Sequence, residues 1–196
     1  MPIKWRRLVI FIVCLLPLAF LIFNALTNKL GADPQKSVVL FMGTWAFYFL
    51  LMTLSVTPLK KIAKQSWLMA HRRMLGLFTL FYALLHVISY FVFILALDFS
   101  SFGAELIKRP YILLTIPAII LLIILGITST KGMMRKLGKN WVKLHKSIYL
   151  VIFLAWLHVL LQIRSSYSDA VLFGVLTAIV LGIRVYWWLQ KKSLQV

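Results

Sequence analysis

Six long apolar segments constrain the fold of this chain more than any other feature of its sequence. Each is about twenty residues long, which is the length an α-helix needs to cross a hydrocarbon core of about 30 Å. Lipid offers no partner for backbone polar groups, so runs of this length favour spanning helices. With 62% hydrophobic residues and a mean hydropathy of +0.95, the chain is predicted to be an integral membrane protein. Its 196 residues are expected to leave no room for a separate soluble domain.

The predicted fold class is an all-α membrane protein with six transmembrane helices in one bundle. The helices are expected over about 8–27, 38–57, 71–97, 111–128, 145–163 and 170–189. Pro58 and the lysines after it are expected to end the second helix, and Pro117 is expected as a tolerated kink inside the fourth. The first segment is longer than a typical signal-peptide core and has no clear cleavage site, so we interpret it as a retained helix.

The net charge of +18 indicates the orientation of these helices. In a soluble protein it would suggest a nucleic-acid partner, but here Lys and Arg concentrate in alternate connections. Sixteen of the 22 lie in the N-terminal segment, the connections after the second and fourth helices, and the C-terminal segment, whereas all four acids lie in other connections. Because cytoplasmic loops retain positive charge, both termini are expected in the cytoplasm.

Several chemistries find no support in the residues. The single cysteine, Cys14, lies in an apolar run, so neither a disulfide framework nor iron-sulfur ligation is expected. The chain has no Gly-rich phosphate loop and no His-Glu-x-x-His motif. No acidic residue lies within a predicted span to relay protons, which disfavours a transporter built on charges at the midplane.

All four histidines lie in the third and fifth apolar segments. An ionisable side chain inside a membrane span is costly and therefore marks a candidate functional site. His86 comes fifteen residues after His71, and His158 comes thirteen after His145, so the two deep histidines are expected at similar heights. Two facing imidazoles at one depth are what bis-histidine ligation of a b-type haem requires. The alternative is that each histidine only hydrogen-bonds a neighbouring helix.

A second site nearer the cytoplasm has less certain ligands, so one or two haems are expected. His145 is one candidate ligand, opposite either His71 or Arg72, and Arg72 can instead pair with a haem propionate. Thirteen residues turn an ideal helix by about 140°, so His145 and His158 face one partner only if the helix is irregular or the two sites are rotated. Arg184, in the last helix, is expected to extend toward the headgroups.

Four stretches of the sequence resemble the ferric-reductase-like transmembrane superfamily. They are L-S-V-T-P-L (Leu54–Leu59), R-R-M-L-G-L (Arg72–Leu77) followed by Leu85-His86, I-T-S-T (Ile127–Thr130) and L-G-K-N-W-V-K-L-H-K-S-I-Y (Leu137–Tyr149). The chain looks most like the haem-binding membrane subunits of bacterial periplasmic methionine sulfoxide reductase systems. The resemblance covers nearly the whole chain, so residues 1–196 are expected to form one domain of this kind.

The resemblance implies a b-type cytochrome of the bacterial inner membrane, an electron-transfer subunit rather than the catalytic one. Its partner would be a periplasmic molybdopterin-containing methionine sulfoxide reductase subunit. The motifs carry haem ligation onto His86, His145 and His158, and the family also implies FMN as a cofactor. Larger members of the superfamily have four histidines in this arrangement, whereas this chain has Arg72 at the fourth position with His71 beside it.

The resemblance also bears on the electron donor. Superfamily members that oxidise NAD(P)H use a C-terminal flavin and nucleotide module, which is not expected in this chain. Electrons are therefore expected from the quinone pool or from a separate flavin reductase. The alternatives are a haem b subunit of another membrane oxidoreductase, a ferric reductase, or a non-redox membrane scaffold in which the histidines only form hydrogen bonds.

Overall fold

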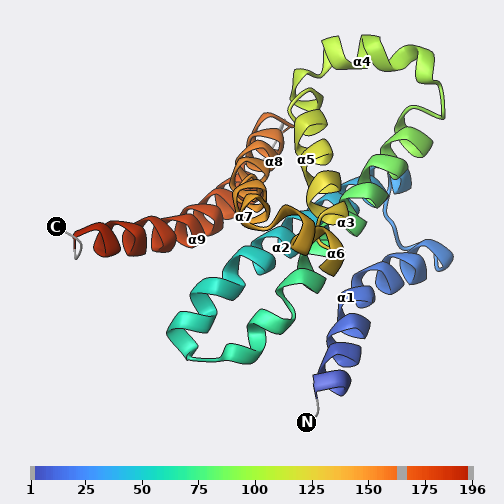
Figure 1. Cartoon of the computed structure of the whole chain (residues 1–196). Helices are drawn as coiled ribbons and strands as arrows, with labels where there is room; N and C mark the ends of the chain where they lie inside the picture. The colour runs from blue at the N-terminus through green and yellow to red at the C-terminus, as the bar shows by residue number, and fades with distance from the viewer. Residues whose placement is uncertain (1–2, 163–166, 194–196) are drawn as a thin grey trace.

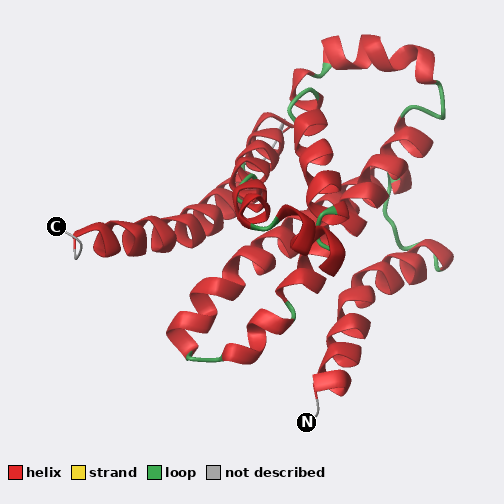
Figure 2. Cartoon of the chain, in the orientation of Figure 1, coloured by secondary structure: helices red, strands yellow, loops and turns green. Residues whose placement is uncertain are grey.

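The structure of the chain is a computed structural model that describes residues 3–162 and 167–193 (Figure 1). These residues are helical apart from short connections and contain no strand (Figure 2). Six helical stretches in this part of the chain are long and apolar enough to cross a membrane. The predicted all-α class with six spanning helices is therefore confirmed. The predicted turn over 164–169 falls partly on residues 163–166, which lie outside the described residues.

The spanning stretches consist of long helices, three of which are joined to a shorter element. The main helices are α1 (Ile3–Leu26), α2 (Pro34–Ala63), α3 (Arg72–Ser89), α5 (Thr115–Ile127), α8 (Ile148–Gln162) and α9 (Ser168–Ser193). A π-helical turn, η2 (Tyr90–Ile94), extends α3, a 3₁₀ turn, η4 (Pro110–Ile112), precedes α5, and α7 (Lys139–His145) precedes α8. The connections hold η1 (Ser66–Ala70), η3 (Phe99–Ser101), α4 (Phe102–Lys108) and α6 (Lys131–Leu137).

Helix α2 lies at the centre of the bundle and packs along α3 (Figure 1). On one side, buried side chains of α1, α2 and α3 form a cluster around Phe49 and Tyr82. On the other side, α2, α5, α8 and α9 form a second cluster around Leu54 and Ile152. Because lipid is as apolar as these side chains, close packing and interhelical hydrogen bonds stabilise such contacts more than the hydrophobic effect does.

Prolines alter three of the helices in different ways. Pro17 lies within α1, and the buried hydroxyl of Tyr82 bridges two backbone groups close to it. It donates to the carbonyl of Cys14 at 2.8 Å and accepts from the N–H of Leu18 at 3.2 Å, the pair that bonds directly in a regular helix. Pro117 is the third residue of α5, where no intrahelical N–H donor is needed, so the predicted interior kink is wrong.

The prediction that Pro58 ends the second helix is also wrong, since α2 continues to Ala63. A proline removes one N–H from the helix, so the carbonyl four residues earlier, that of Leu54, loses its usual partner. Arg184 of α9 donates a hydrogen bond to this carbonyl through Nη2. The helix ends at Ala63 instead, and the residue that caps it, Lys64, adopts a left-handed conformation with φ of 54°.

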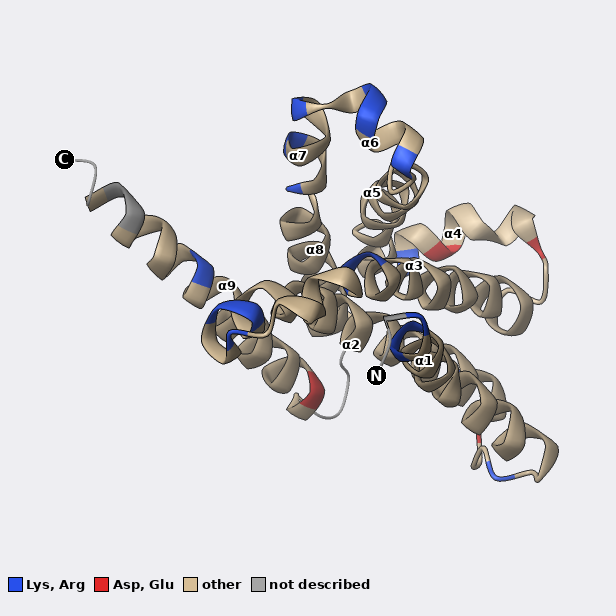
Figure 3. Cartoon of the chain, turned by 60° about the horizontal axis from the view of Figure 1, so that its bottom comes forward, with Lys and Arg blue, Asp and Glu red and all other residues tan. Residues whose placement is uncertain are grey.

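The two ends of the bundle differ in charge (Figure 3). Arg6 lies 5.8 Å from the ring centroid of Trp67, and Lys61 lies 4.2 Å from that of Trp187, so the start of α1, the α2–α3 connection and the last turns of α9 share one end. Arg73 donates to the carbonyl of Ser129 at 3.2 Å, which adds the connection after α5 to this basic end. The acidic residues mark the opposite end, around α4, the start of α2 and the start of α9 (Figure 3).

Candidate functional site

His86 of α3 and His158 of α8 face each other inside the bundle, as the sequence predicted for two deep histidines. Their ring centroids are 6.4 Å apart and the ring planes make an angle of 77°. The two residues are far apart in the chain, and they meet because α3 and α8 both pack around α2 and α5. We call His86 and His158 the histidine pair.

The orientation of His86 depends on a glycine of α2. Its Nδ1 lies 2.9 Å from the carbonyl oxygen of Val39. A Cβ atom at Gly43, the next turn of α2, would lie 2.9 Å from the same Nδ1 and 3.0 Å from Cε1. Only glycine therefore allows the imidazole to lie against the backbone of α2 at this point.

His158 is oriented in the same manner by a different element. Its Nδ1 lies 3.1 Å from the carbonyl oxygen of Tyr111, and the Tyr111 ring lies 5.5 Å from the imidazole. Tyr111 belongs to η4, which Pro110 begins. Helix α5 begins only a few residues after Tyr111. The 3₁₀ turn before it therefore holds the Tyr111 carbonyl against His158 of α8.

Both imidazoles of the pair leave one ring nitrogen available to a metal. A carbonyl only accepts hydrogen bonds, so each Nδ1 carries the proton and each Nε2 keeps its lone pair. No hydrogen bond to either Nε2 is found among the described residues. A histidine whose second nitrogen donates to a carbonyl is the usual arrangement of a metal-ligating imidazole.

The separation of the two rings fits one metal ion between them. An imidazole nitrogen binds a first-row transition metal at about 2.0–2.1 Å, and two such bonds plus the half-widths of the rings give a centroid separation close to 6.4 Å. No group of three or more His, Cys, Asp or Glu that would hold a bare metal ion exists in the described ranges. Two opposed ligands suit a metal whose other positions are already filled, as in a porphyrin.

His145 has different surroundings, near the basic end. Its Nε2 lies 3.1 Å from the hydroxyl of Thr128, and its ring stacks on Trp141 with centroids 4.0 Å apart. The Thr128 hydroxyl donates to the carbonyl of Ile124 at 2.7 Å, so it accepts from His145. The Nε2 of His145 therefore carries the proton, and Trp141 in turn donates to the carbonyl of Thr128 at 2.9 Å.

His71 and Arg72 lie at the junction of η1 and α3. His71 is 3% exposed, and its Nδ1 lies 3.1 Å from the carbonyl of Trp67, while its buried Nε2 has no hydrogen-bond partner in the described part of the chain. Arg72 lies within electrostatic range of His145 and Arg184. We call His71, Arg72 and His145 the basic-end cluster; its contacts are to separate neighbours rather than between the two histidines.

The helix that carries His145 and His158 is irregular, which is one of the two conditions that the spacing of thirteen residues imposed. Helix α7 ends at His145, Lys146 and Ser147 form a turn, and α8 begins at Ile148. The regular helix is therefore interrupted between the two histidines. The Ser147 hydroxyl in this turn is buried and without a partner among the described residues.

Sequence reasoning missed the role of Arg184. The guanidinium was expected to extend toward the headgroups. In the structure it donates instead to the Leu54 carbonyl through Nη2 and to the Tyr149 hydroxyl through Nη1. The signal was present in the sequence: Pro58 leaves the carbonyl four residues before it without a donor. Arg184 thus ties α9 to α2 and α8 close to the basic-end cluster.

This fold and site define a multi-pass membrane protein with two facing histidines between its helices. The model of the ferric reductase like transmembrane component family matches residues 42–156. The chain is 40% identical over 187 residues to the protein-methionine-sulfoxide reductase heme-binding subunit MsrQ of Herminiimonas arsenicoxydans, which covers 94% of this chain and 86% of the relative. No solved structure matches the chain.

A second relative gives the same result. The MsrQ heme-binding subunit of Rhodospirillum rubrum is 34% identical over 180 residues, which covers 91% of this chain and 86% of the relative. The chain therefore belongs to the ferric-reductase-like transmembrane family, among its MsrQ members. The family prediction made from the sequence motifs is confirmed.

Proposed function

We propose that the chain is a b-type cytochrome subunit of the bacterial inner membrane, with both termini in the cytoplasm. It carries electrons from quinol, or from a flavin reductase, to a periplasmic MsrP-like methionine sulfoxide reductase subunit that contains molybdopterin. Electron transfer through the bilayer supports the repair of oxidised periplasmic proteins. The observation that carries this proposal is the opposed histidine pair, with its 6.4 Å separation and two Nε2 atoms that make no hydrogen bond to the described residues.

In this proposal His86 and His158 would hold the iron of a haem b through their Nε2 atoms. The haem supplies one-electron chemistry when bound. The carbonyls of Val39 and Tyr111 fix the ring orientations and make the imidazoles more basic toward the iron. Because Gly43 has no side chain, His86 can lie close enough to α2 to reach the Val39 carbonyl.

The basic-end cluster has a secondary role in the proposal. His145 would be a ligand of a second haem, with His71 as the candidate second ligand, and Arg72 would pair with a propionate. The free and buried Nε2 of His71 favours it as a ligand, whereas His145 must exchange its Thr128 hydrogen bond for a metal bond or bind through Nδ1. FMN is proposed as a further cofactor on family grounds only.

The orientation is supported by charge. Sixteen of the 22 Lys and Arg residues belong to the N-terminal and C-terminal segments and the two connections of the basic end, where three contacts join the segments. Positive charge is retained in the cytoplasm. The opposite end, which holds all four acidic residues and lies nearer the histidine pair, would then face the periplasmic partner.

The haem content of the purified protein tests the proposal. The detergent-solubilised chain should show the reduced-minus-oxidised spectrum of a b-type cytochrome, with at least one haem per chain by the pyridine haemochrome method. A correctly folded preparation without haem would refute it. For the partner, the reduced protein should be reoxidised by an MsrP-like subunit with methionine sulfoxide present and not by a molybdenum-free form of that subunit.

A further inference from the structure

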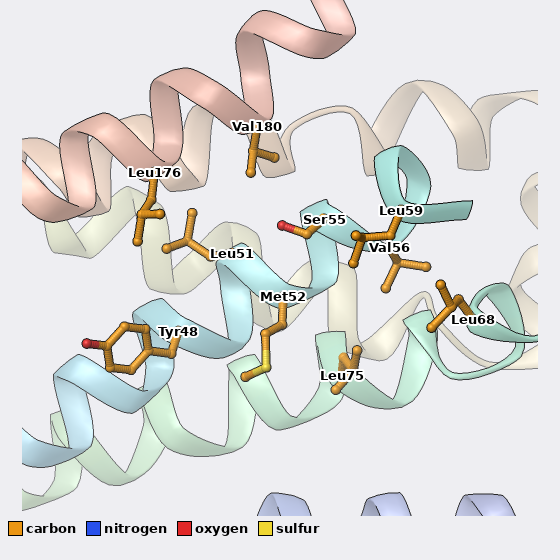
Figure 4. A pocket seen from close by; sticks show the side chains of 10 residues that line it. All are labelled: Tyr48, Leu51, Met52, Ser55, Val56, Leu59, Leu68, Leu75, Leu176 and Val180. Carbon is orange, nitrogen blue, oxygen red and sulfur yellow. The ribbon is translucent and has the colours of Figure 1, made fainter. Parts of the chain in front are cut away.

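An apolar groove of about 380 Å³ lies on the flank of α2, between α9 on one side and the η1–α3 junction on the other (Figure 4). Side chains of α2 form its floor along one helical stripe, including Tyr48, Met52 and Val56. Leu176 and Val180 point into it from α9 (Figure 4). The volume is in the range of a ligand pocket, and the lining is suited to a hydrocarbon chain.

The basic end of this groove carries an arginine. Leu176, Val180 and Arg184 follow each other at intervals of four residues, so Arg184 continues the same stripe of α9 one turn beyond the groove lining. Its guanidinium reaches the carbonyl of Leu54, which precedes the groove residue Ser55 on α2. An arginine thus lies where the apolar groove approaches the membrane boundary.

The charge at this position is not neutralised by the protein. In the described part of the chain, Arg184 makes no ion pair with a carboxylate, and its partners are a carbonyl and a phenol. Two of its five N–H groups are used by these contacts. Arg72 adds a second positive charge within electrostatic range, and the exposed Lys60 follows the groove residue Leu59 on α2.

We propose that this groove binds an anionic phospholipid, with one acyl chain along α2 and α9 and the phosphate against Arg184. Basic pockets between transmembrane helices are suited to anionic headgroups because arginine forms charge-assisted hydrogen bonds to phosphate. The lipid completes the packing of α9, which leans away from the central helices (Figure 1). This assignment does not depend on electron transfer or on haem.

Native mass spectrometry of the delipidated protein tests this site, with phosphatidylglycerol, phosphatidylcholine of the same chains, or a long-chain ubiquinone added at equal concentration. Phosphatidylglycerol should bind at one site about tenfold more tightly than phosphatidylcholine. The variant Arg184→Gln combined with Pro58→Ala should lose this preference. The backbone N–H that Pro58→Ala restores bonds the Leu54 carbonyl, so the double variant removes the charge without leaving that carbonyl unpaired.

Two further variants separate the acyl chain from the charge. Val180→Phe fills the groove and should weaken binding of phosphatidylglycerol with Arg184 intact. Arg73→Gln removes an equal charge at the same end, away from the groove, and should leave binding unchanged. Equal binding of the two phospholipids, loss of binding in Arg73→Gln to the same extent, or displacement of phosphatidylglycerol by ubiquinone would each overturn the proposal.

Discussion

The histidine pair and the basic-end cluster use the same residue type in different states. His86 and His158 each donate through Nδ1 to a backbone carbonyl of another element, and their Nε2 atoms are left for a shared ligand. His145 instead donates its Nε2 to Thr128. His71 shares the arrangement of the pair, with Nδ1 against the Trp67 carbonyl and a free Nε2, but its ring contacts no other histidine among the described residues. The comparison teaches that two features together prepare imidazoles to share a metal: a backbone carbonyl that accepts from one ring nitrogen, and a second imidazole facing the ring.

Loss of either member of the histidine pair should have the largest effect. His86→Ala or His158→Ala removes an axial ligand, and we expect haem affinity to fall by more than about 100-fold, since even outer partners of ligating histidines account for about 10–100-fold. Haem content per purified chain measures this. His71→Ala serves as the comparison variant and should retain the haem of the pair. Equal loss of haem in all three variants would contradict the difference between the histidine pair and the basic-end cluster.

A substitution that touches neither histidine should reproduce part of this loss. The Cβ of Gly43→Ala would lie 2.9 Å from Nδ1 of His86 and would displace the ring from the Val39 carbonyl. We expect haem affinity to fall by about tenfold. Gly76→Ala is a matched control on α3, because its Cβ would meet only a Thr53 methyl at 3.6 Å. Unchanged haem content in Gly43→Ala would show that this carbonyl does not orient the ligand.

The stability of the basic end should depend on the hydrogen bond between Arg184 and the Leu54 carbonyl more than on bound haem. Arg184→Gln leaves the Leu54 carbonyl without its donor, at a cost of about 1–3 kcal/mol in the free energy of unfolding. Adding Pro58→Ala should recover most of this loss, whereas Arg73→Gln should change stability by less than about 0.5 kcal/mol. Unfolding in mixed detergent micelles measures all of these variants. Additive effects of the two substitutions would contradict the link between Pro58 and Arg184.

The smallest effect should come from Thr128→Val, which removes the acceptor of the His145 Nε2–H. The loss of one hydrogen bond costs about 0.5–1.5 kcal/mol, and the haem of the histidine pair should be unaffected. If His145 binds a second haem through Nε2, the freed nitrogen should raise occupancy of that site. Lower occupancy would instead assign ligation to Nδ1, with Thr128 holding the ring in place.

Much of the fold follows from the sequence because apolar length is a local property. The six segments, and the matched depth of His86 and His158, need only counting along the chain. The helix ends were less accessible: α2 passes through Pro58 because an arginine 130 residues after Leu54 bonds the freed carbonyl. Likewise Tyr82 bridges the backbone of α1 beside Pro17, a contact between residues far apart in the sequence.

The state of each histidine could not be predicted from its position. Which nitrogen of His145 carries the proton depends on its contact with Thr128, a residue seventeen positions earlier at the end of α5. The close approach at Gly43 depends on how α2 and α3 pack. The motifs identified the family, and the assignment of individual ligands stays a prediction.

Electron paramagnetic resonance of the oxidised, purified protein tests the central claim most directly. Two imidazoles on one ferric iron produce a low-spin signal, and ring planes near perpendicular, here at 77°, leave two iron d orbitals nearly equal in energy and make that signal highly anisotropic. We predict such a signal in the wild-type protein and its loss in His86→Ala and His158→Ala. A high-spin signal in the wild type, or a low-spin signal that survives both substitutions, would contradict ligation by the histidine pair.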